Sequence, residues 1–191
     1  MQRRLLLGTP ALLLAAPLSA ATVGERLSAG DHVLLMRHAE APGVGDPPGL
    51  RLDDCSTQRN LSAAGREQAR AAGRWLRAQG LQAAQVWSSP WCRCLDTARL
   101  LDYGAVAVEP SLSSFFGDYE RGPQQREALQ AFIARLQDAP PGPAPVLVTH
   151  QVVISAYAGG SVPSAEMVLV RVDRQGRPQD VRRYAPPAAA Q

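Results

Sequence analysis

The 191-residue chain has no lysine, so that all 20 of its basic residues are arginines. Aromatic residues make up only 5% of the chain, and just three cysteines and three histidines occur. No uninterrupted apolar run approaches the roughly 20 residues of a membrane-spanning helix. With 46% hydrophobic residues, the composition is that of a soluble globular protein rather than a disordered, fibrous or disulfide-dense one. The length is typical of one domain.

Excess charge of either sign is also lacking, because the formal net charge is only +3. Removal of an N-terminal segment that contains Arg3 and Arg4 would lower it by two, to +1. Proteins that bind nucleic acid carry a much stronger basic balance. We therefore expect no nucleic-acid partner, and any function of the arginines should be local.

The first 21 residues have the three parts of a secretory signal peptide. Arg3 and Arg4 form the basic part, residues 5–16 are mostly apolar, and small residues occupy 19–21. We expect cleavage after Ala20 or Ala21 and a periplasmic protein without stable membrane insertion. A retained anchor is the alternative, and the arginine pair also permits the twin-arginine export route.

Three cysteines, Cys55, Cys92 and Cys94, would then face an oxidising compartment. One disulfide from Cys55 to either Cys92 or Cys94 is compatible with this setting and would leave one thiol over. Three small buried side chains are an equally good interpretation, since the sequence does not give the Cα separation that a disulfide requires. The spacing of Cys92 and Cys94 differs from that of zinc ligands, and we expect no metal site.

Short apolar runs alternate with helical patterns, which predicts an α/β fold: a three-layer α/β/α sandwich with a mainly parallel central sheet. We expect this domain over residues 22–184, followed by a disordered tail over 185–191. Residues 41–60 and 111–123 have the composition of loops. The predicted strands are 32–36, 85–87, 105–108, 146–148 and 167–172.

Four helices are expected between or after these strands. The first should be capped by Ser62 and stop at Gly80. The second should begin at Ser89-Pro90, with the serine hydroxyl as cap, and run to Leu101. A third carries Leu129 to Leu136, and a fourth should follow His150 and stop at Gly159-Gly160.

Two arginines and two histidines follow the carboxyl ends of predicted strands. Arg37 and His38 end the first, Arg93 lies in the first helical turn after the second, and His150 ends a later one. Ligands of open α/β sheets bind at this edge. Guanidinium groups match phosphoryl oxygens in pairs, and a neutral imidazole can attack phosphorus. Each residue alone could be structural, but together they indicate an anion pocket with a nucleophile.

The chain resembles the histidine phosphatase superfamily, whose fold is phosphoglycerate mutase-like, over roughly residues 31–173. The matching motifs are Arg37-His38-Ala39-Glu40, the helix signature at 61–69, Ser88-Ser89-Pro90 with Arg93 and Thr97-Ala98, and Val148-Thr149-His150. The resemblance implies that His38 is a transiently phosphorylated nucleophile, that Arg37 and Arg93 bind phosphate, and that His150 is the second histidine of the pocket.

The chain departs from the family at the proton donor. Ala39 replaces a glycine, which is a mild change. Mutase-like members carry a glutamate where this chain has the serines of 112–116, and phytase-like members carry an aspartate where it has Gln151. Mutase and phytase activities are therefore disfavoured. The nearest substitutes are Asp118 and Glu120, with Glu120 preferred by its place in the motif, although both could lie in a solvated loop.

The resemblance and the N-terminus together predict a phosphomonoester hydrolase with a periplasmic or cell-envelope phosphorylated substrate, independent of metal and organic cofactors. With a signal peptide, a compact domain and no usual acid, the chain resembles periplasmic phosphatases proposed to act on heptose phosphate of the lipopolysaccharide core. Gln58 and Arg59 are the best substrate contacts in the loop before the first helix, against a role in loop hydrogen bonding. The alternative function is a phosphate-binding module with negligible turnover. The sequence leaves the oligomeric state open.

Overall fold

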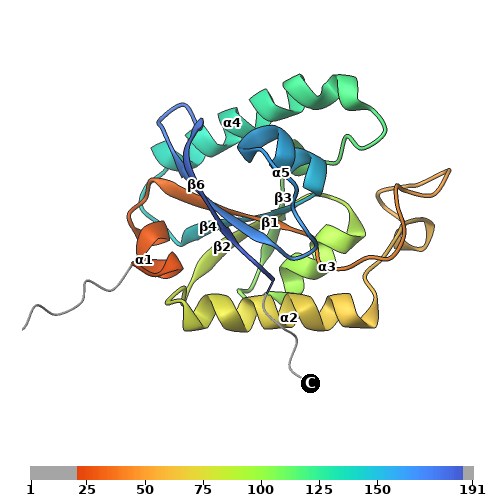
Figure 1. The fold of residues 1–191 in the computed structure, drawn as a ribbon, viewed down its shortest axis with the longest axis horizontal. Helices are drawn as coiled ribbons and strands as arrows, with labels where there is room; N and C mark the ends of the chain where they lie inside the picture. The colour runs from red at the N-terminus through yellow and green to blue at the C-terminus, as the bar shows by residue number, and fades with distance from the viewer. Residues whose placement is uncertain (1–20, 187–191) are drawn as a thin grey trace, which may run out of the picture.

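The computed structural model describes residues 21–186. Residues 1–20 of the predicted signal peptide and residues 187–191 of the predicted tail lie outside the described residues. Its six strands form one sheet in the order β3-β2-β4-β1-β5-β6 (Figure 1). The strands are β1 (His32–Arg37), β2 (Ala84–Ser88), β3 (Val106–Val108), β4 (Ala144–Thr149), β5 (Met167–Val172) and β6 (Pro178–Tyr184).

The sheet is mixed, with a parallel part that agrees with the prediction. β1 to β4 run parallel to one another, whereas β5 is antiparallel to β1 and β6 is antiparallel to β5. The sequence analysis did not predict β6. This edge strand has no fully buried residue and reads as polar, so it lacks the apolar run by which the other strands are recognised.

Helices cover both faces of the sheet, which confirms the three-layer architecture (Figure 1). One face is covered by α1 (Val23–Ser28), α2 (Ala63–Ala78) and α3 (Cys92–Leu100), and the other by α4 (Gly122–Asp138) and α5 (Gln151–Ala158). Three short 3₁₀ turns lie in the predicted loops: η1 (Cys55–Thr57), η2 (Pro110–Leu112) and η3 (Tyr119–Arg121). The short helix α1 was not predicted.

Buried strand residues alternate between two cores. In β1, Leu34 and Met36 pack with the α1–α3 layer, while Val33 and Leu35 pack with the α4–α5 layer. All four are fully buried. The continuous apolar run in the sequence therefore results from burial on both faces of a central strand.

The predicted ends of α2 are confirmed, but the predicted start of α3 is wrong. The Ser62 hydroxyl accepts a hydrogen bond from the Gly65 amide at 2.8 Å, and Gly80 follows the helix with φ of +85°. By contrast, α3 begins at Cys92, and the side chain of its N-cap residue, Trp91, makes no capping hydrogen bond. The Ser89 hydroxyl, which the sequence predicted to cap this helix, instead lies 2.8 Å from Nε2 of His150. His150 follows another strand, β4, so a tertiary contact replaces the predicted local cap.

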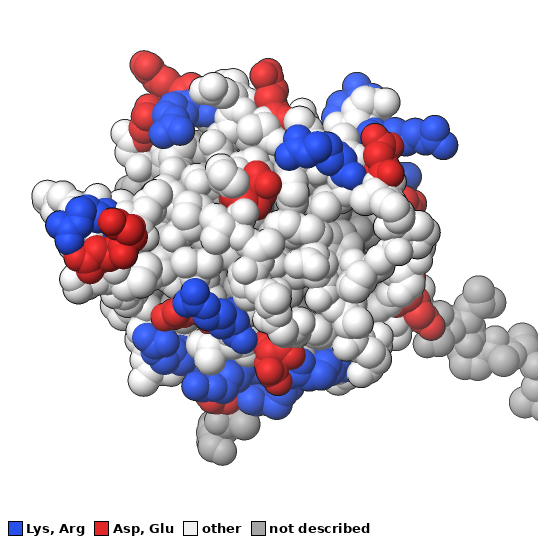
Figure 2. All heavy atoms as spheres, turned by 180° about the vertical axis from the view of Figure 1, so that it is seen from behind, with Lys and Arg blue, Asp and Glu red and all other residues white. Residues whose placement is uncertain are grey.

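The face turned away from the viewer in Figure 1 carries charges in small mixed groups. Figure 2 shows basic and acidic side chains beside one another around its edge, with a largely uncharged centre. Among the described helices, none is long and apolar enough to cross a membrane.

Candidate active site

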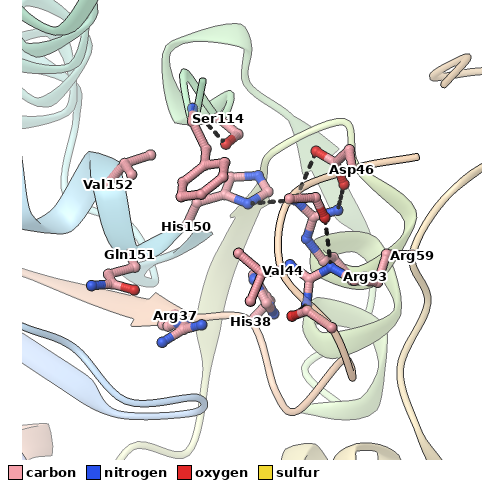
Figure 3. Close-up of a pocket in the computed structure, with 13 residues that line it drawn as sticks. Arg37, His38, Val44, Asp46, Arg59, Arg93, Ser114, His150, Gln151 and Val152 are labelled. Atoms are coloured by element: carbon pink, nitrogen blue, oxygen red, sulfur yellow. Dashed lines mark hydrogen bonds and ion pairs between the residues drawn. The ribbon is translucent and has the colours of Figure 1, made fainter. Parts of the chain in front are cut away.

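The structure brings the two predicted arginines and two predicted histidines into one cavity of about 140 Å³ at the carboxyl ends of the parallel strands (Figure 3). Arg37 is the last residue of β1, and His38 follows with its amide hydrogen-bonded to Thr149 O of β4 at 2.9 Å. Arg93 lies in the first turn of α3, and His150 is the N-cap residue of α5. Strand ends far apart in sequence thus place all four side chains together.

His38 is held with one ring nitrogen available for attack. Its Nδ1 lies 2.8 Å from the Ala39 carbonyl oxygen, and since a carbonyl can only accept, Nδ1 carries the proton. Nε2 therefore bears the free lone pair. The side chain is 2% exposed, and burial, together with the charges of Arg93 and Arg37, lowers its pKa to about 3. The imidazole is neutral and nucleophilic at neutral pH.

His150 is locked in the opposite tautomer. Arg93 donates from Nη2 to His150 Nδ1 at 3.3 Å, so the proton lies on Nε2, which faces the Ser89 hydroxyl. Burial first, and then the charge of Arg93, lower the pKa of His150 well below its usual value. In this state His150 is a neutral side chain that holds the Arg93 guanidinium in place.

The two phosphate-binding candidates each have an unused donor. Arg37 donates from Nη1 to the Val162 carbonyl at 2.7 Å. The Nε atoms of Arg37 and Arg93 are buried and have no hydrogen-bond partner among the described residues. Buried polar groups normally find a partner, and a phosphoryl group would supply one here.

Of the two predicted substrate contacts, Arg59 lines the cavity and Gln58 does not. The Gln58 side chain is buried; its amide oxygen accepts from the Cys92 amide at 2.9 Å, and its amide nitrogen donates to Arg51 O. It therefore caps the start of α3 in place of Ser89. This is the loop hydrogen bonding that the sequence left open as the alternative.

The predicted substitutes for the proton donor lie away from the cavity. Asp118 and Glu120 are exposed, and neither lines it. Asp118 faces Arg121 at 3.9 Å. In contrast, Gln151 and Ser114, a residue of the segment 112–116, do line the cavity, and neither side chain is an acid.

The acid that sequence reasoning missed is Asp46, which comes from the loop between β1 and α2 (Figure 3). It forms a two-pronged ion pair with Arg93, with Oδ1 2.5 Å from Nη1 and Oδ2 3.2 Å from Nη2. Oδ2 also accepts from Trp91 Nε1 at 3.0 Å. No local motif marks Asp46, because the loop composition around it, Gly-Val-Gly-Asp-Pro-Pro, is that of any exposed turn.

A disulfide ties this loop to α3. Cys55 is bonded to Cys92, directly before Arg93, with a Cα separation of 5.7 Å. The structure thus decides between the pairings that the sequence left open. Cys94 is the remaining thiol; it is buried, and burial raises its pKa to about 12. Over the described residues, His, Cys, Asp and Glu side chains form no group of three or more that could hold a metal ion.

A family profile of the histidine phosphatase superfamily (branch 1) matches residues 33–130, slightly more than half of the chain. The chain belongs to the histidine phosphatase superfamily. The matched region contains His38 and Arg93, and it ends before His150.

Solved structures of several phosphatases share the fold. The protein histidine phosphatase SixA in complex with tungstate has a TM-score of 0.56 and 22% identity, covering 81% of this chain and 97% of SixA. Mycobacterial glucosyl-3-phosphoglycerate phosphatase has a TM-score of 0.56 and 19% identity, with 80% and 96% covered. A phosphoserine phosphatase variant from Entamoeba histolytica, bound to phosphoserine, has a TM-score of 0.51 and 16% identity, with 78% and 93% covered. No curated protein sequence matches the chain.

Proposed function

We propose that this histidine phosphatase hydrolyses phosphomonoesters through a phosphohistidine on His38. The observation that carries the proposal is the state of His38: neutral, buried, and with the Nε2 lone pair free because Nδ1 donates to Ala39 O. A neutral imidazole beside two guanidinium groups suits attack on an anionic phosphoryl group. Binding of phosphate alone would need only the arginines.

The arginines supply the charge that this reaction needs. Arg37 and Arg93 would hold the phosphoryl oxygens through their Nη groups and their unpaired Nε groups as phosphorus moves between leaving group and nucleophile. His150 acts as a positioning residue, since its neutral Nδ1 accepts from Arg93. We propose that no metal takes part, and a chelator should leave the activity unchanged.

Trapping of the intermediate tests the proposal. The protein is exposed briefly to an aryl phosphate whose phosphate group is labelled, and the reaction is quenched without acid. The label should then be found on His38, and His38→Ala should abolish the labelling. His32→Asn is the matched control, because His32 lies at the start of β1, outside the cavity. His150→Ala should lower turnover and retain the labelled site. Phosphate binding without hydrolysis or labelling in the wild type would favour the binding module instead.

We also propose that the protein is exported and acts on a periplasmic or cell-envelope phosphate ester. The Cys55–Cys92 disulfide supports an oxidising compartment. Thr22 and Glu25 form a capping box at the start of α1, which cleavage after Ala20 or Ala21 would leave intact. Intact mass of the periplasmic protein tests cleavage. Retention of residues 1–20, or extraction of the protein only with membranes, would contradict it.

The substrate class is tested by a screen of phosphorylated sugars (heptose phosphates among them), phosphorylated lipids and nucleotides.

A further inference from the structure

Asp46 is the one carboxylic acid among the described residues that line the cavity. We propose that Asp46 is the proton donor of this phosphatase: a bound phosphoryl group displaces its carboxylate from Arg93, the released carboxylate takes up a proton from solvent, and the resulting carboxylic acid protonates the leaving oxygen. The inference rests on the proposed phosphohistidine reaction. It assigns the acid to a loop residue outside every motif that identified the family.

Asp46 and a phosphoryl group would use the same donors. Both carboxylate oxygens contact Arg93, at 2.5 and 3.2 Å, in the paired geometry by which guanidinium binds phosphate. A phosphoryl group that takes these two donors must displace the carboxylate, and its negative charge repels it further. The ion pair seen without substrate is thus the resting state of Asp46, in which it occupies the anion-binding side of Arg93.

The position of Asp46 fits the leaving-group side of the reaction. His38 is 2% exposed, at the floor of the cavity, whereas the Asp46 side chain is 22% exposed and lies nearer the mouth. In Figure 3 the two side chains lie on opposite sides of the Arg93 guanidinium. In-line displacement places the leaving oxygen opposite the nucleophile. An ester bound on Arg93 and attacked by His38 therefore directs its leaving oxygen toward the mouth, where Asp46 lies.

Displacement also changes the protonation of Asp46 in the required direction. Burial alone would raise its pKa, but the hydrogen bond and charge of Arg93, with smaller contributions from the Trp91 hydrogen bond and the Arg59 charge, outweigh burial and hold the pKa below its usual value. Once phosphate oxygens occupy Arg93, the effect of burial remains and a nearby anion is added. Both favour the protonated acid.

The loop backbone is anchored so that the displaced side chain stays at the site. Arg59 donates from Nε to Gly45 O at 2.9 Å and from Nη1 to Gly43 O at 3.0 Å. These bonds fix the segment directly before Asp46 against the cavity wall. Arg59 therefore positions the acid, rather than serving mainly as a substrate contact.

The reaction proceeds in two displacements at phosphorus. The His38 Nε2 lone pair forms the N–P bond while the bond between phosphorus and the ester oxygen breaks, and that oxygen takes the proton of Asp46. The alcohol leaves, which gives phosphohistidine and an Asp46 carboxylate. This carboxylate accepts a proton from water as the water oxygen attacks phosphorus and the N–P bond breaks. Inorganic phosphate leaves and neutral His38 is restored, and Asp46 releases its proton to solvent as it pairs again with Arg93.

Leaving-group dependence of Asp46→Asn tests the assignment. Benzyl phosphate and 4-nitrophenyl phosphate have similar rings, but only the benzyl alcohol is a poor leaving group that needs protonation. A positioned acid contributes about 10²–10⁴-fold. We expect Asp46→Asn to lower kcat on benzyl phosphate by about that factor and kcat on 4-nitrophenyl phosphate by less than about tenfold. The alkaline limb of the pH profile with benzyl phosphate should also disappear.

Three variants serve as controls: Asp53→Asn, exposed in the same loop, and Asp118→Asn and Glu120→Gln, the exposed acids that the sequence suggested. All three should match the wild type on both esters. Vanadate binding of Asp46→Asn should be as tight as in the wild type or tighter, because a competitor for Arg93 has gone.

Other outcomes overturn the assignment. Equal losses on both esters together with weaker vanadate binding would mean that Asp46 only orients Arg93. Faster hydrolysis of both esters would make it an inhibitory ion pair and nothing more. A wild type that neither hydrolyses the esters nor labels His38 would overturn the proposed function, and the role of Asp46 with it.

Discussion

The imidazole rings of His38 and His150 meet edge to face, with centroids 5.5 Å apart and planes at 68°. Both are buried, and burial lowers the pKa of each, that of His38 to about 3. In the unfolded chain their pKa returns to about 6.5. Below pH 6.5 these two histidines are therefore protonated in the unfolded state and remain neutral in the folded state.

The folded state should lose stability as the pH falls from 6.5 toward 3. The expected slope is about 1.4 kcal/mol per pH unit for each of the two histidines, measured as the free energy of unfolding in urea. His38→Asn should reduce the slope by the contribution of one histidine. An identical slope in His38→Asn and the wild type would contradict the buried neutral state.

Replacement of Arg93 by lysine should weaken vanadate binding. The variant keeps a positive charge but removes the planar fork, at a cost of about 1.5–3 kcal/mol for hydrogen bonds to a charged group, or roughly 10- to 160-fold in Kd. Arg37→Lys should behave similarly. Arg74→Lys, in an exposed ion pair with Glu67 on α2, is the control. Titration of the three variants with vanadate measures the effect, and unchanged affinity in Arg93→Lys would remove it from the anion site.

Reduction of the Cys55–Cys92 disulfide should lower both stability and activity. The bond joins residues 37 apart, and the chain-entropy model gives a stabilisation of about 4 kcal/mol for such a loop. It also holds the Asp46 loop against the start of α3, so its loss should reduce kcat. The double variant Cys55→Ser/Cys92→Ser should be equally impaired and insensitive to dithiothreitol. A reductant that affects wild type and double variant alike would argue against this bond.

The mouth of the cavity has an apolar side that should favour an apolar leaving group. Val44 and Phe116 line the cavity and are 89% and 49% exposed. Loss of an aromatic contact of about 0.5–1.5 kcal/mol predicts that Phe116→Ala raises KM for benzyl phosphate roughly 2- to 12-fold. Vanadate binding should not change. Leu52→Ala, at an exposed loop position outside the cavity, is the control, and a KM equal to that of the wild type in Phe116→Ala would contradict the contact.

The sequence alone determined the frame of the site. Apolar runs and strand-end motifs were enough to predict the parallel strands, α2 and the meeting of Arg37, His38, Arg93 and His150, because residues at the carboxyl ends of adjacent parallel strands share one edge. Each strand and each motif can be recognised from a short stretch of sequence. The fold then brings these recognisable residues together at one edge of the sheet.

The tertiary structure alone decided which loop residues belong to that site. Asp46 reaches Arg93 across 47 positions of the chain, and Gln58 caps α3 from 34 positions away. Ser89, which local rules make a helix cap, bonds His150 instead. These contacts depend on how a glycine- and proline-rich loop folds back over the strand ends, where side-chain contacts rather than backbone periodicity set the conformation. Such a loop carries no repeating pattern from which its partners could be read.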